Sequence, residues 1–344
     1  MFIEAISCLE AKSKVPMDPE GDVDFNIPGT LSKHMPRTAD MSRVLVDFAP
    51  IRIDRGVDNH VVAGTQGELL ILDSEGIPRG KSATPFPAPT LDGKILNGRW
   101  FGIWLDREFR QAIMAALPLD QDPEDGPSRE ELRSSIGGAG RVVPANSVWH
   151  RALDSEPMKI GSFGENLVFA TLSGVYMIDR DANEIWRAPP PSWPSISFLG
   201  QYNNVVSINE FPLGLAIWSQ AGGVSVLDPN TGMEVFSRVV ELDDKLSKVD
   251  YCEEAGWILM MHDGSVATMT EIEGVHSTFR TSGPVMDAKF VDGRWTWTGW
   301  RHDGCLLDGK VSTTARREIG VSILGDMVLE NDGAWSPWGF PSPT

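Results

Sequence analysis

A repeated pattern of apolar strand, glycine-containing turn and second apolar strand runs along most of the chain. Clear examples are HVVAGTQGELLILD at residues 60–73, NLVFATLSGVYMID at 166–179 and GWILMMHDGSVATM at 256–269. Short runs rich in β-branched and aromatic residues, bounded by turn residues, are typical of β-strands. Between residues 174 and 304 the central glycines recur about every 40 to 50 residues, which indicates a repeated structural unit.

Seven such hairpins are found along the chain. Their turns are centred at Gly67, Glu108, Gly174, Gly223, Gly264, Gly304 and Gly333. Further strand-like runs flank each hairpin, for example SKVDYCEEA before Gly264 and VHSTFRTSG after it. Four strands in about 40 residues are typical of a propeller blade. The pattern therefore predicts an all-β protein, a single β-propeller whose seven four-stranded blades span residues 43–340. Six blades is the alternative count, because the last unit is compressed.

Three segments fall outside this repeat. Residues 118–145 are acidic and rich in proline and glycine, so we expect an inserted loop in the second blade, with a short helix at Ser128–Ser135. A closed ring must pair or cover its open edge. We therefore expect residues 1–9, MFIEAISCL, to complete the last blade as a closing strand. Residues 10–42 would form an irregular linker into the first blade.

Three repeats carry an aspartate at the end of an apolar strand. They are LLILDSEGIPRG, VYMIDRDANEIW and VSVLDPNTGMEVF, with Asp73, Asp179 and Asp228 at the turn. These units resemble blades of the quinoprotein-like and WD-repeat-like propeller superfamily. The resemblance implies the fold. It carries over no catalytic residue and no cofactor, because the Trp-Asp dipeptides of WD repeats and the ligand set of a quinone-dependent dehydrogenase are not found in the sequence.

The charge of the chain restricts its partners. The formal net charge is −18, and no Lys/Arg stripe interrupts it, so neither nucleic acid nor an anionic membrane is an expected partner. The acidity fits either simple solubility or a basic protein partner.

The three cysteines, Cys8, Cys252 and Cys305, lie far apart, and no apolar run reaches the roughly 18 residues of a membrane span. We therefore expect a cytoplasmic protein.

The tripeptide His-Asp-Gly occurs twice, at His262 and at His302. Asp-Gly is a strong hairpin signal, and the interval equals that of the repeat. We interpret the two copies as the same turn in adjacent blades, too far apart to share a zinc ion, whose ligand nitrogens lie about 2 Å from the metal. The sequence shows no other metal-ligand spacing, nucleophile elbow or phosphate-binding loop, so we expect no catalytic residue, cofactor or metal.

Two segments are candidates for partner binding. In APPPSWPS (residues 188–195) we expect Pro190, Pro191 and Trp193 to form an exposed, extended connection. In the insertion the candidates are the carboxylates Asp122, Glu124 and Asp125.

The leading functional hypothesis is a non-enzymatic scaffold that binds a protein partner. One alternative is a metal-dependent hydrolase or lyase at the mouth of the central channel. Its candidate residues are Asp47, Lys159, Asp250, Asp287 and Asp326. The other is a carbohydrate- or peptide-binding module that uses the tryptophans.

Overall fold

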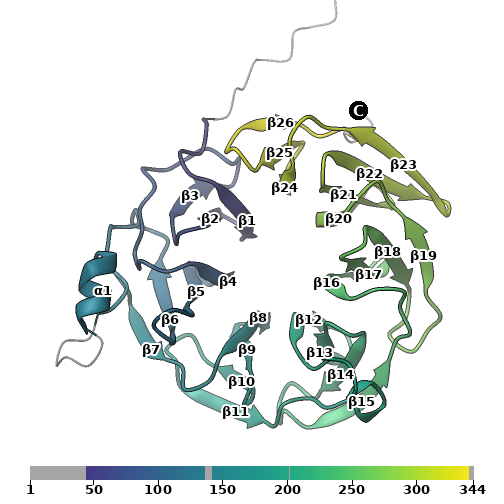
Figure 1. Ribbon diagram of the computed structural model, residues 1–344, viewed down its shortest axis with the longest axis horizontal. Coiled ribbons are helices and arrows are strands. Elements are labelled where there is room, and N and C mark those ends of the chain that lie inside the picture. The colour runs from purple at the N-terminus through teal and green to yellow at the C-terminus, as the bar shows by residue number, and fades with distance from the viewer. Residues whose placement is uncertain (1–43, 136–141, 201, 341–344) are drawn as a thin grey trace, which may run out of the picture. The chain divides into compact units, whose positions relative to one another are not determined.

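A computed structural model describes residues 44–135, 142–200 and 202–340, and these residues form a ring of seven antiparallel β-sheets (Figure 1). Each sheet is one blade, with its first strand nearest the centre of the ring and its last strand outermost. The predicted seven-bladed, all-β propeller is confirmed.

The first four blades follow one another along the chain. Blade one contains β1 (Pro50–Arg55), β2 (Asn59–Gly64) and β3 (Leu69–Asp73). Blade two contains β4 (Thr90–Leu96), β5 (Arg99–Asp106), β6 (Gln111–Pro118) and β7 (Trp149–Ala152). Blade three contains β8 (Pro157–Phe163), β9 (Asn166–Thr171), β10 (Gly174–Ile178) and β11 (Glu184–Ala188). Blade four contains β12 (Val205–Phe211), β13 (Gly214–Ser219), β14 (Gly223–Leu227) and β15 (Glu234–Val239).

The remaining three blades complete the ring. Blade five contains β16 (Leu246–Cys252), β17 (Gly256–Met261), β18 (Ser265–Met269) and β19 (Ser277–Arg280). Blade six contains β20 (Val285–Val291), β21 (Arg294–Gly299), β22 (His302–Leu307) and β23 (Lys310–Ala315). Blade seven contains β24 (Gly320–Leu324), β25 (Met327–Glu330) and β26 (Trp335–Pro337). Beside β3 of blade one, isolated bridges at Pro78 and Ala83 extend the sheet where a fourth strand would lie.

Blade one packs directly against blade seven. The backbone N–H of Val46, just before β1, donates a hydrogen bond of 3.0 Å to the carbonyl of Gly333 in the β25–β26 turn. Val46 also shares an apolar cluster with Leu72 of blade one and with Leu324 and Leu329 of blade seven. The predicted closing strand at residues 1–9 and the linker at 10–42 lie outside the described residues and stay predictions.

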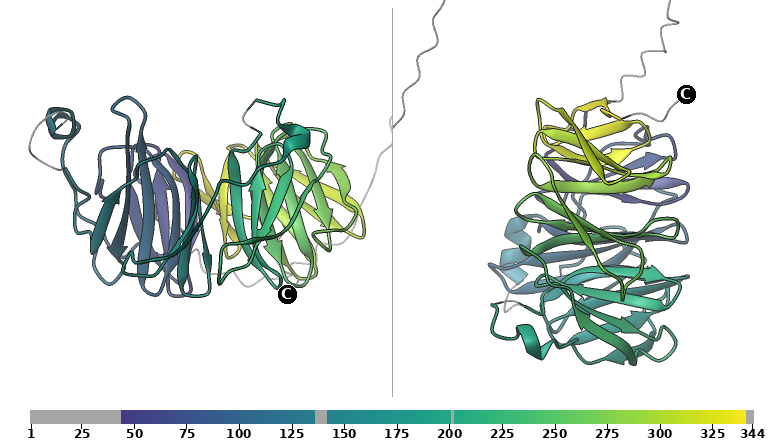
Figure 2. Two further views of the ribbon diagram at one scale, coloured as in Figure 1. Left: turned by 90° about the horizontal axis from the view of Figure 1, so that it is seen from below. Right: turned by 90° about the vertical axis from the view of Figure 1, so that its right-hand side faces the viewer.

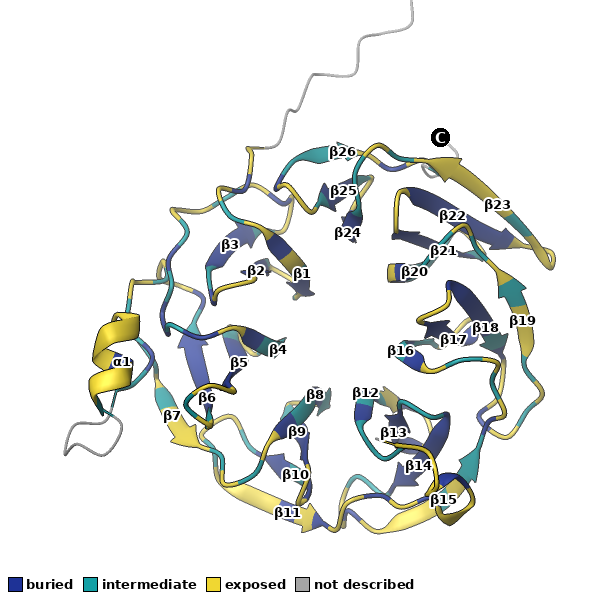
Figure 3. Cartoon of the chain, in the orientation of Figure 1, coloured by how far each residue is buried: buried dark blue, intermediate teal, exposed yellow. Residues whose placement is uncertain are grey.

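The core lies between neighbouring blades. Every residue of β13 and of β17 is buried, because each middle strand is covered on both faces by adjacent sheets (Figure 3). This is why these strands read as continuous apolar runs rather than alternating ones. The tryptophans fill the space between the sheets: the rings of Trp218 in blade four and Trp257 in blade five lie 5.4 Å apart, centroid to centroid.

The insertion in blade two packs against the ring. It contains α1 (Arg129–Ser135), which confirms the predicted helix. Ser128 and Glu131 form a capping box, with the backbone N–H of Ser128 donating to the Glu131 carboxylate at 2.7 Å. Leu132 is fully buried in the cluster that holds Trp100 and Trp104. The acidic insertion is therefore attached to the core by several apolar side chains, among them Leu119 and Leu132.

The interpretation of the two His-Asp-Gly copies as equivalent turns is wrong. His262–Gly264 does form the β17–β18 turn, but His302 begins β22, and the turn before it is Trp300–Arg301, with a φ of 56° at Arg301. Gly304 is therefore a strand residue. A Cβ there would lie 2.3 Å from Nε1 of Trp297, so the glycine admits that indole.

Burial of Asp303 outweighs the turn preference of the Asp-Gly pair. Its carboxylate forms an ion pair with Arg316, accepts a hydrogen bond of 2.7 Å from the Thr298 hydroxyl and accepts another of 2.9 Å from the Gly339 N–H. A buried carboxylate with this many partners must lie inside the blade, not in a solvent-exposed turn.

Candidate functional site

The turns of the blades lie on two opposite faces of the ring (Figure 2). In an antiparallel blade, the turn between strands one and two and the turn between strands three and four leave the sheet at the same end. The turn between strands two and three leaves at the other end, as does the connection to the next blade. Each blade therefore contributes the same turns to the same face.

The face with the first and third turns is strongly acidic, and we call it the acidic face. Apart from the insertion, which is the third turn of blade two and contains Arg129 and Arg133, the described turns of this face contain one arginine, Arg180, and no lysine. The exposed carboxylates of these turns outside the insertion are Asp58, Glu75, Glu165, Asp181, Glu253, Glu254, Glu271, Glu273, Asp292, Asp308 and Asp326. Charges of one sign gathered on a rigid face produce a field that attracts cations.

The aspartates that mark the resembled repeats hold the turns of this face. Asp179 and Asp228 accept hydrogen bonds from backbone N–H groups two to four residues further on, at 2.9 Å. The side chain of Asn183 lowers the pKa of Asp179, and the Thr231 hydroxyl lowers that of Asp228. Both carboxylates therefore stay ionised and keep the turns in a fixed shape.

The opposite face carries both signs of charge. Arginines there pair with nearby carboxylates: Arg107 with Glu156 at 3.0 Å, and Arg280 with Asp263 at 2.5 Å. The carboxylates of this face are thus mixed with cations, whereas outside the insertion those of the acidic face are accompanied by Arg180 alone.

A groove of about 470 Å³ lies on the acidic face where blades three, four and five meet; we call it the blade 3–5 groove. Its aromatic lining comes from the ends of the inner strands β8, β12 and β16, and includes Phe163, Phe211 and Tyr251. The rings of Phe211 and Tyr251 meet edge to face, 5.9 Å apart. Glu210 and Glu253 are both exposed beside these rings.

One hydrogen bond ties the groove together, and burial keeps its phenol neutral. The carboxylate of Glu210 accepts a hydrogen bond of 3.0 Å from the N–H of Gly164, which ties blade four to the turn of blade three. Burial raises the pKa of Tyr251, and the charge of Glu253 raises it further. The phenol therefore stays neutral in a negative environment.

The seven inner strands line the central channel. Each has a β-bulge at its start, and its third residue follows this bulge. These third residues are Arg52, Asp92, Lys159, Ser207, Lys248, Asp287 and Ser322. The four that can accept a hydrogen bond receive one from a backbone N–H of the next blade: Asp92 from Ile160, Ser207 from Val249, Asp287 from Ile323 and Ser322 from Ile53, at 2.8 to 3.2 Å. The channel residues thus join neighbouring blades.

An ion cluster connects four blades beside the channel. Asp287 of blade six is buried, pairs with Arg55 of blade one and with Lys248 of blade five at 3.1 Å, and accepts the Ile323 N–H of blade seven. Lys248 also lies 2.9 Å from Asp250. Burial opposes ionisation of both Asp287 and Lys248, but attraction between the opposite charges is stronger. It lowers the pKa of Asp287 and raises that of Lys248.

The five channel-mouth candidates do not converge. Asp250 and Asp287 come together, but around Lys248, and Lys159 pairs with Asp92 at 3.6 Å. Asp47 precedes β1 and accepts a hydrogen bond from Ser82, whereas Asp326 follows β24, so the two lie at opposite ends of the inner strands. Nowhere in the described ranges do three or more His, Cys, Asp or Glu residues form a group that could hold a metal ion.

The expected exposure of Trp193 is wrong. The indole is 2% exposed and packs on Gly223, where a Cβ would lie 2.4 Å from Cδ2 of the ring. Pro191 is buried as well, and Pro190 is exposed. The sequence missed this because proline-rich segments are usually solvated, whereas here the short 3₁₀ helix η1 (Pro194–Ile196) folds the chain onto blade four.

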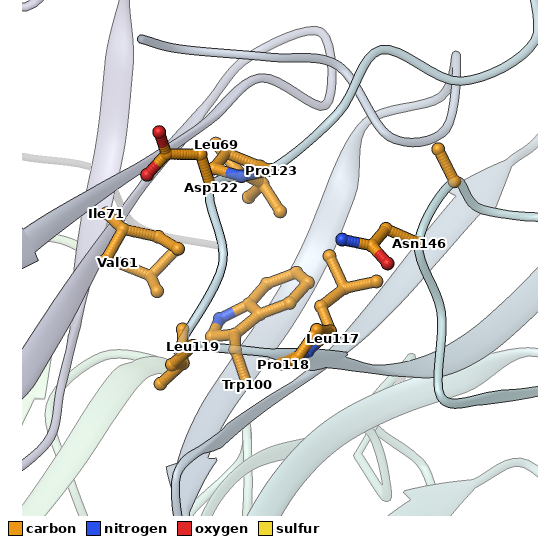
Figure 4. A pocket seen from close by; sticks show the side chains of 11 residues that line it. Val61, Leu69, Ile71, Trp100, Leu117, Pro118, Leu119, Asp122, Pro123 and Asn146 are labelled. Carbon is orange, nitrogen blue, oxygen red and sulfur yellow. The ribbon is translucent and has the colours of Figure 1, made fainter. Parts of the chain in front are cut away.

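The insertion carboxylates face solvent or brace the loop. Asp125 accepts the Thr84 N–H at 2.8 Å, Glu124 is exposed, and Asp122 packs against Gly80. Beneath them, Val61, Trp100 and Leu117 line a cavity of about 10 Å³, room for about one water molecule. The carboxylate of Asp122 points away from the Trp100 ring (Figure 4). Partner binding by these residues stays a prediction.

No protein-family profile matches the chain, and no curated protein matches it. Solved structures do resemble it in fold. The WD40 β-propeller domain of Doa1 matches with a TM-score of 0.58 and 9% identity, covering 87% of this chain and 97% of that one. The computationally designed Ika8 protein matches with a TM-score of 0.53 and 10% identity, covering 86% and 98%. BamB from Moraxella catarrhalis matches with a TM-score of 0.51 and 13% identity, covering 87% and 86%.

These matches establish the fold. They bear out the resemblance to WD-repeat-like and quinoprotein-like propellers, and at such low identity they transfer no activity. None of the helices described here has the length and apolar character needed to cross a bilayer.

Proposed function

We propose that the protein is a non-enzymatic cytoplasmic scaffold and that its acidic face binds a basic protein segment. The observation that carries this proposal is the separation of charge between the two faces. Carboxylates fill the turns of one face, whereas on the opposite face they are mixed with arginines, and two of those arginines, Arg107 and Arg280, form ion pairs. A propeller offers a broad, rigid surface, and a field of one sign selects partners of the other sign and speeds their association.

The channel supports the same proposal. Its charged residues lie in ion pairs or interblade hydrogen bonds, such as those of Asp287 and Asp92, and these contacts hold the blades together. A stable ring with fixed turns presents the carboxylates in a constant arrangement. We therefore assign the channel to stability and the acidic face to binding.

The test measures binding of a fluorescent peptide of six Arg-Gly repeats, with a Glu-Gly peptide as the control for charge. One variant neutralises four exposed positions of the acidic face: D58N, E165Q, D292N and D308N. The matched variant neutralises four exposed positions of the opposite face: D154N, E241Q, D243N and D332N.

We expect the first variant to weaken binding at least tenfold at 50 mM salt and the second to weaken it less than threefold. Wild-type affinity should fall steeply with salt, since exposed charges are screened. Equal losses in the two variants, or no binding of the Arg-Gly peptide by the wild type, would overturn the proposal.

A further inference from the structure

The blade 3–5 groove differs from the rest of the acidic face in having an aromatic lining. Elsewhere on this face the carboxylates stand on short turns, such as Asp292 and Gly293 between β20 and β21. In the groove, three consecutive inner strands carry an aromatic residue at or next to their end: Phe163 is the last residue of β8, Phe211 is the last of β12, and Tyr251 is the last but one of β16. The groove is therefore both negative and aromatic.

The aromatic lining is rigid. Phe211 packs against Trp257 at 5.2 Å between ring centroids, and Tyr251 packs against the same indole at 4.7 Å. Trp257 itself is 1% exposed and belongs to the core between blades four and five. Rings held in this way do not have to be ordered when a ligand binds, so little conformational entropy is lost.

The charges of the groove specify the sign of its ligand. Glu210 and Glu253 are exposed at its edge, and no lysine or arginine lines it. Aromatic faces attract cations through their quadrupoles, and neighbouring carboxylates add charge-assisted hydrogen bonds. A neutral apolar side chain would gain nothing from the carboxylates, and an anionic one would be repelled.

We propose that the blade 3–5 groove binds an arginine side chain of the basic partner. This inference rests on the proposed function and names the position on the acidic face where specificity resides. Arginine fits better than lysine, because its planar guanidinium stacks on aromatic rings and donates several hydrogen bonds in a fixed geometry. The exposed side chain of Leu213, at the edge of the groove, contacts the apolar part of the arginine or its neighbour.

The experiment compares two double variants that remove the same charge from the same face. E210Q/E253Q changes the groove, and the glutamine oxygen at position 210 still accepts the Gly164 N–H, so the fold is retained. D292N/D308N changes exposed turns of blade six and is the matched control. The probe is the peptide of six Arg-Gly repeats, with citrulline-Gly and Lys-Gly peptides of the same length, at 150 mM salt.

We expect E210Q/E253Q to weaken Arg-Gly binding at least tenfold and D292N/D308N less than threefold. The citrulline peptide should bind the wild type at least tenfold more weakly than the arginine peptide, and the lysine peptide about threefold more weakly. If the arginine peptide binds but both double variants lose affinity equally, the groove assignment fails while the acidic-face proposal stands. If the wild type does not bind the arginine peptide at all, both proposals fail.

Discussion

Replacing Asp287 by asparagine tests whether the channel charges hold the blades together. Asp287 is the centre of the ion cluster, because its carboxylate contacts Arg55 and Lys248 and accepts the Ile323 N–H at 2.9 Å. Asparagine has nearly the same shape and can still accept the hydrogen bond from Ile323. The substitution therefore removes the negative charge while it keeps the packing.

The expected loss of stability depends on how far the two cationic partners of Asp287 are exposed to water. Removing one partner of a fully buried ion pair costs about 3 to 5 kcal/mol, because the remaining charge is left unpaired away from water. The side chain of Asp287 is 3% exposed, but those of Arg55 and Lys248 are 36% and 37% exposed, so water stabilises them in part. We therefore expect Asp287→Asn to lower the free energy of unfolding by about 2 kcal/mol.

The effect also depends on pH. The pKa of Asp287 is lower in the folded protein than in the unfolded chain, so its stabilising contribution is complete above the ordinary aspartate value of about 4. It is lost as the pH falls below that value and through the folded-state pKa, because the protonated carboxyl no longer attracts the two cations. The difference between wild type and variant should be constant from pH 7 to about pH 5 and should shrink below about pH 4.

Urea unfolding followed by tryptophan fluorescence measures both effects, since many of the tryptophans are buried between blades. The matched control is Asp326→Asn, which makes the same charge change at an exposed turn and should alter stability by less than about 0.5 kcal/mol. If Asp287→Asn is no more destabilising than Asp326→Asn at pH 7, the cluster does not stabilise the ring, and the assignment of the channel to stability is wrong.

Three further substitutions test buried packing contacts by thermal or urea unfolding. Trp193→Ala should lower the free energy of unfolding by about 3 to 5 kcal/mol, because the indole is buried. The control, Pro190→Ala, changes an exposed position and should lower it by less than about 0.5 kcal/mol. Equal effects of the two substitutions would contradict the burial of Trp193. Gly304→Ala should cost about 1 to 3 kcal/mol, since its Cβ would meet Trp297, and Gly200→Ala, with open space around it, serves as the control. Leu132→Ala should cost about 2 to 5 kcal/mol and speed proteolysis of the insertion, because Leu132 anchors α1 in the core; unchanged proteolysis would show that α1 is held by its surface contacts instead.

The sequence predicted the ring because the local signals agree with the tertiary fold. Apolar runs such as those of β13 and β17 are continuous where both faces of a sheet are covered, and the turns at Gly67 and Gly333 provide the positive φ values that tight turns require. Such signals depend on neighbours close in the chain. They therefore give the hairpins, the blade count and the short helix at Arg129–Ser135.

Local signals failed where distant contacts decide the structure. The Asp-Gly pair at Asp303 favours a turn, yet an ion pair with Arg316 and the packing of Gly304 under Trp297 place it in a strand. Likewise, the proline-rich surroundings of Trp193 favour exposure, yet the indole fits against Gly223. Neither partner is adjacent in sequence, so the pattern around each residue cannot reveal the contact.

The blade 3–5 groove was missed for a related reason, although part of its signal is present in the sequence. Phe163 and Phe211 occupy equivalent positions at the ends of β8 and β12, and Tyr251 lies one residue before the corresponding position in β16. Comparing the ends of the inner strands across repeats, rather than motifs along the chain, would have placed the three aromatic residues on neighbouring blades. The carboxylates at Glu210 and Glu253 would then have completed the groove.

Burial separates two kinds of charge in this protein. Around the channel, each buried carboxylate must be matched by a cation or a backbone N–H, because an unpaired charge away from water is costly; Asp287 meets this condition with contacts to three other blades. On the acidic face, carboxylates such as Asp58 and Asp292 stand in water and need no partner for folding. Their mutual repulsion is tolerable because they are spread over separate blades. A ring stabilised by matched charges inside can therefore carry an excess of one sign on a single face, and that excess remains available for a partner.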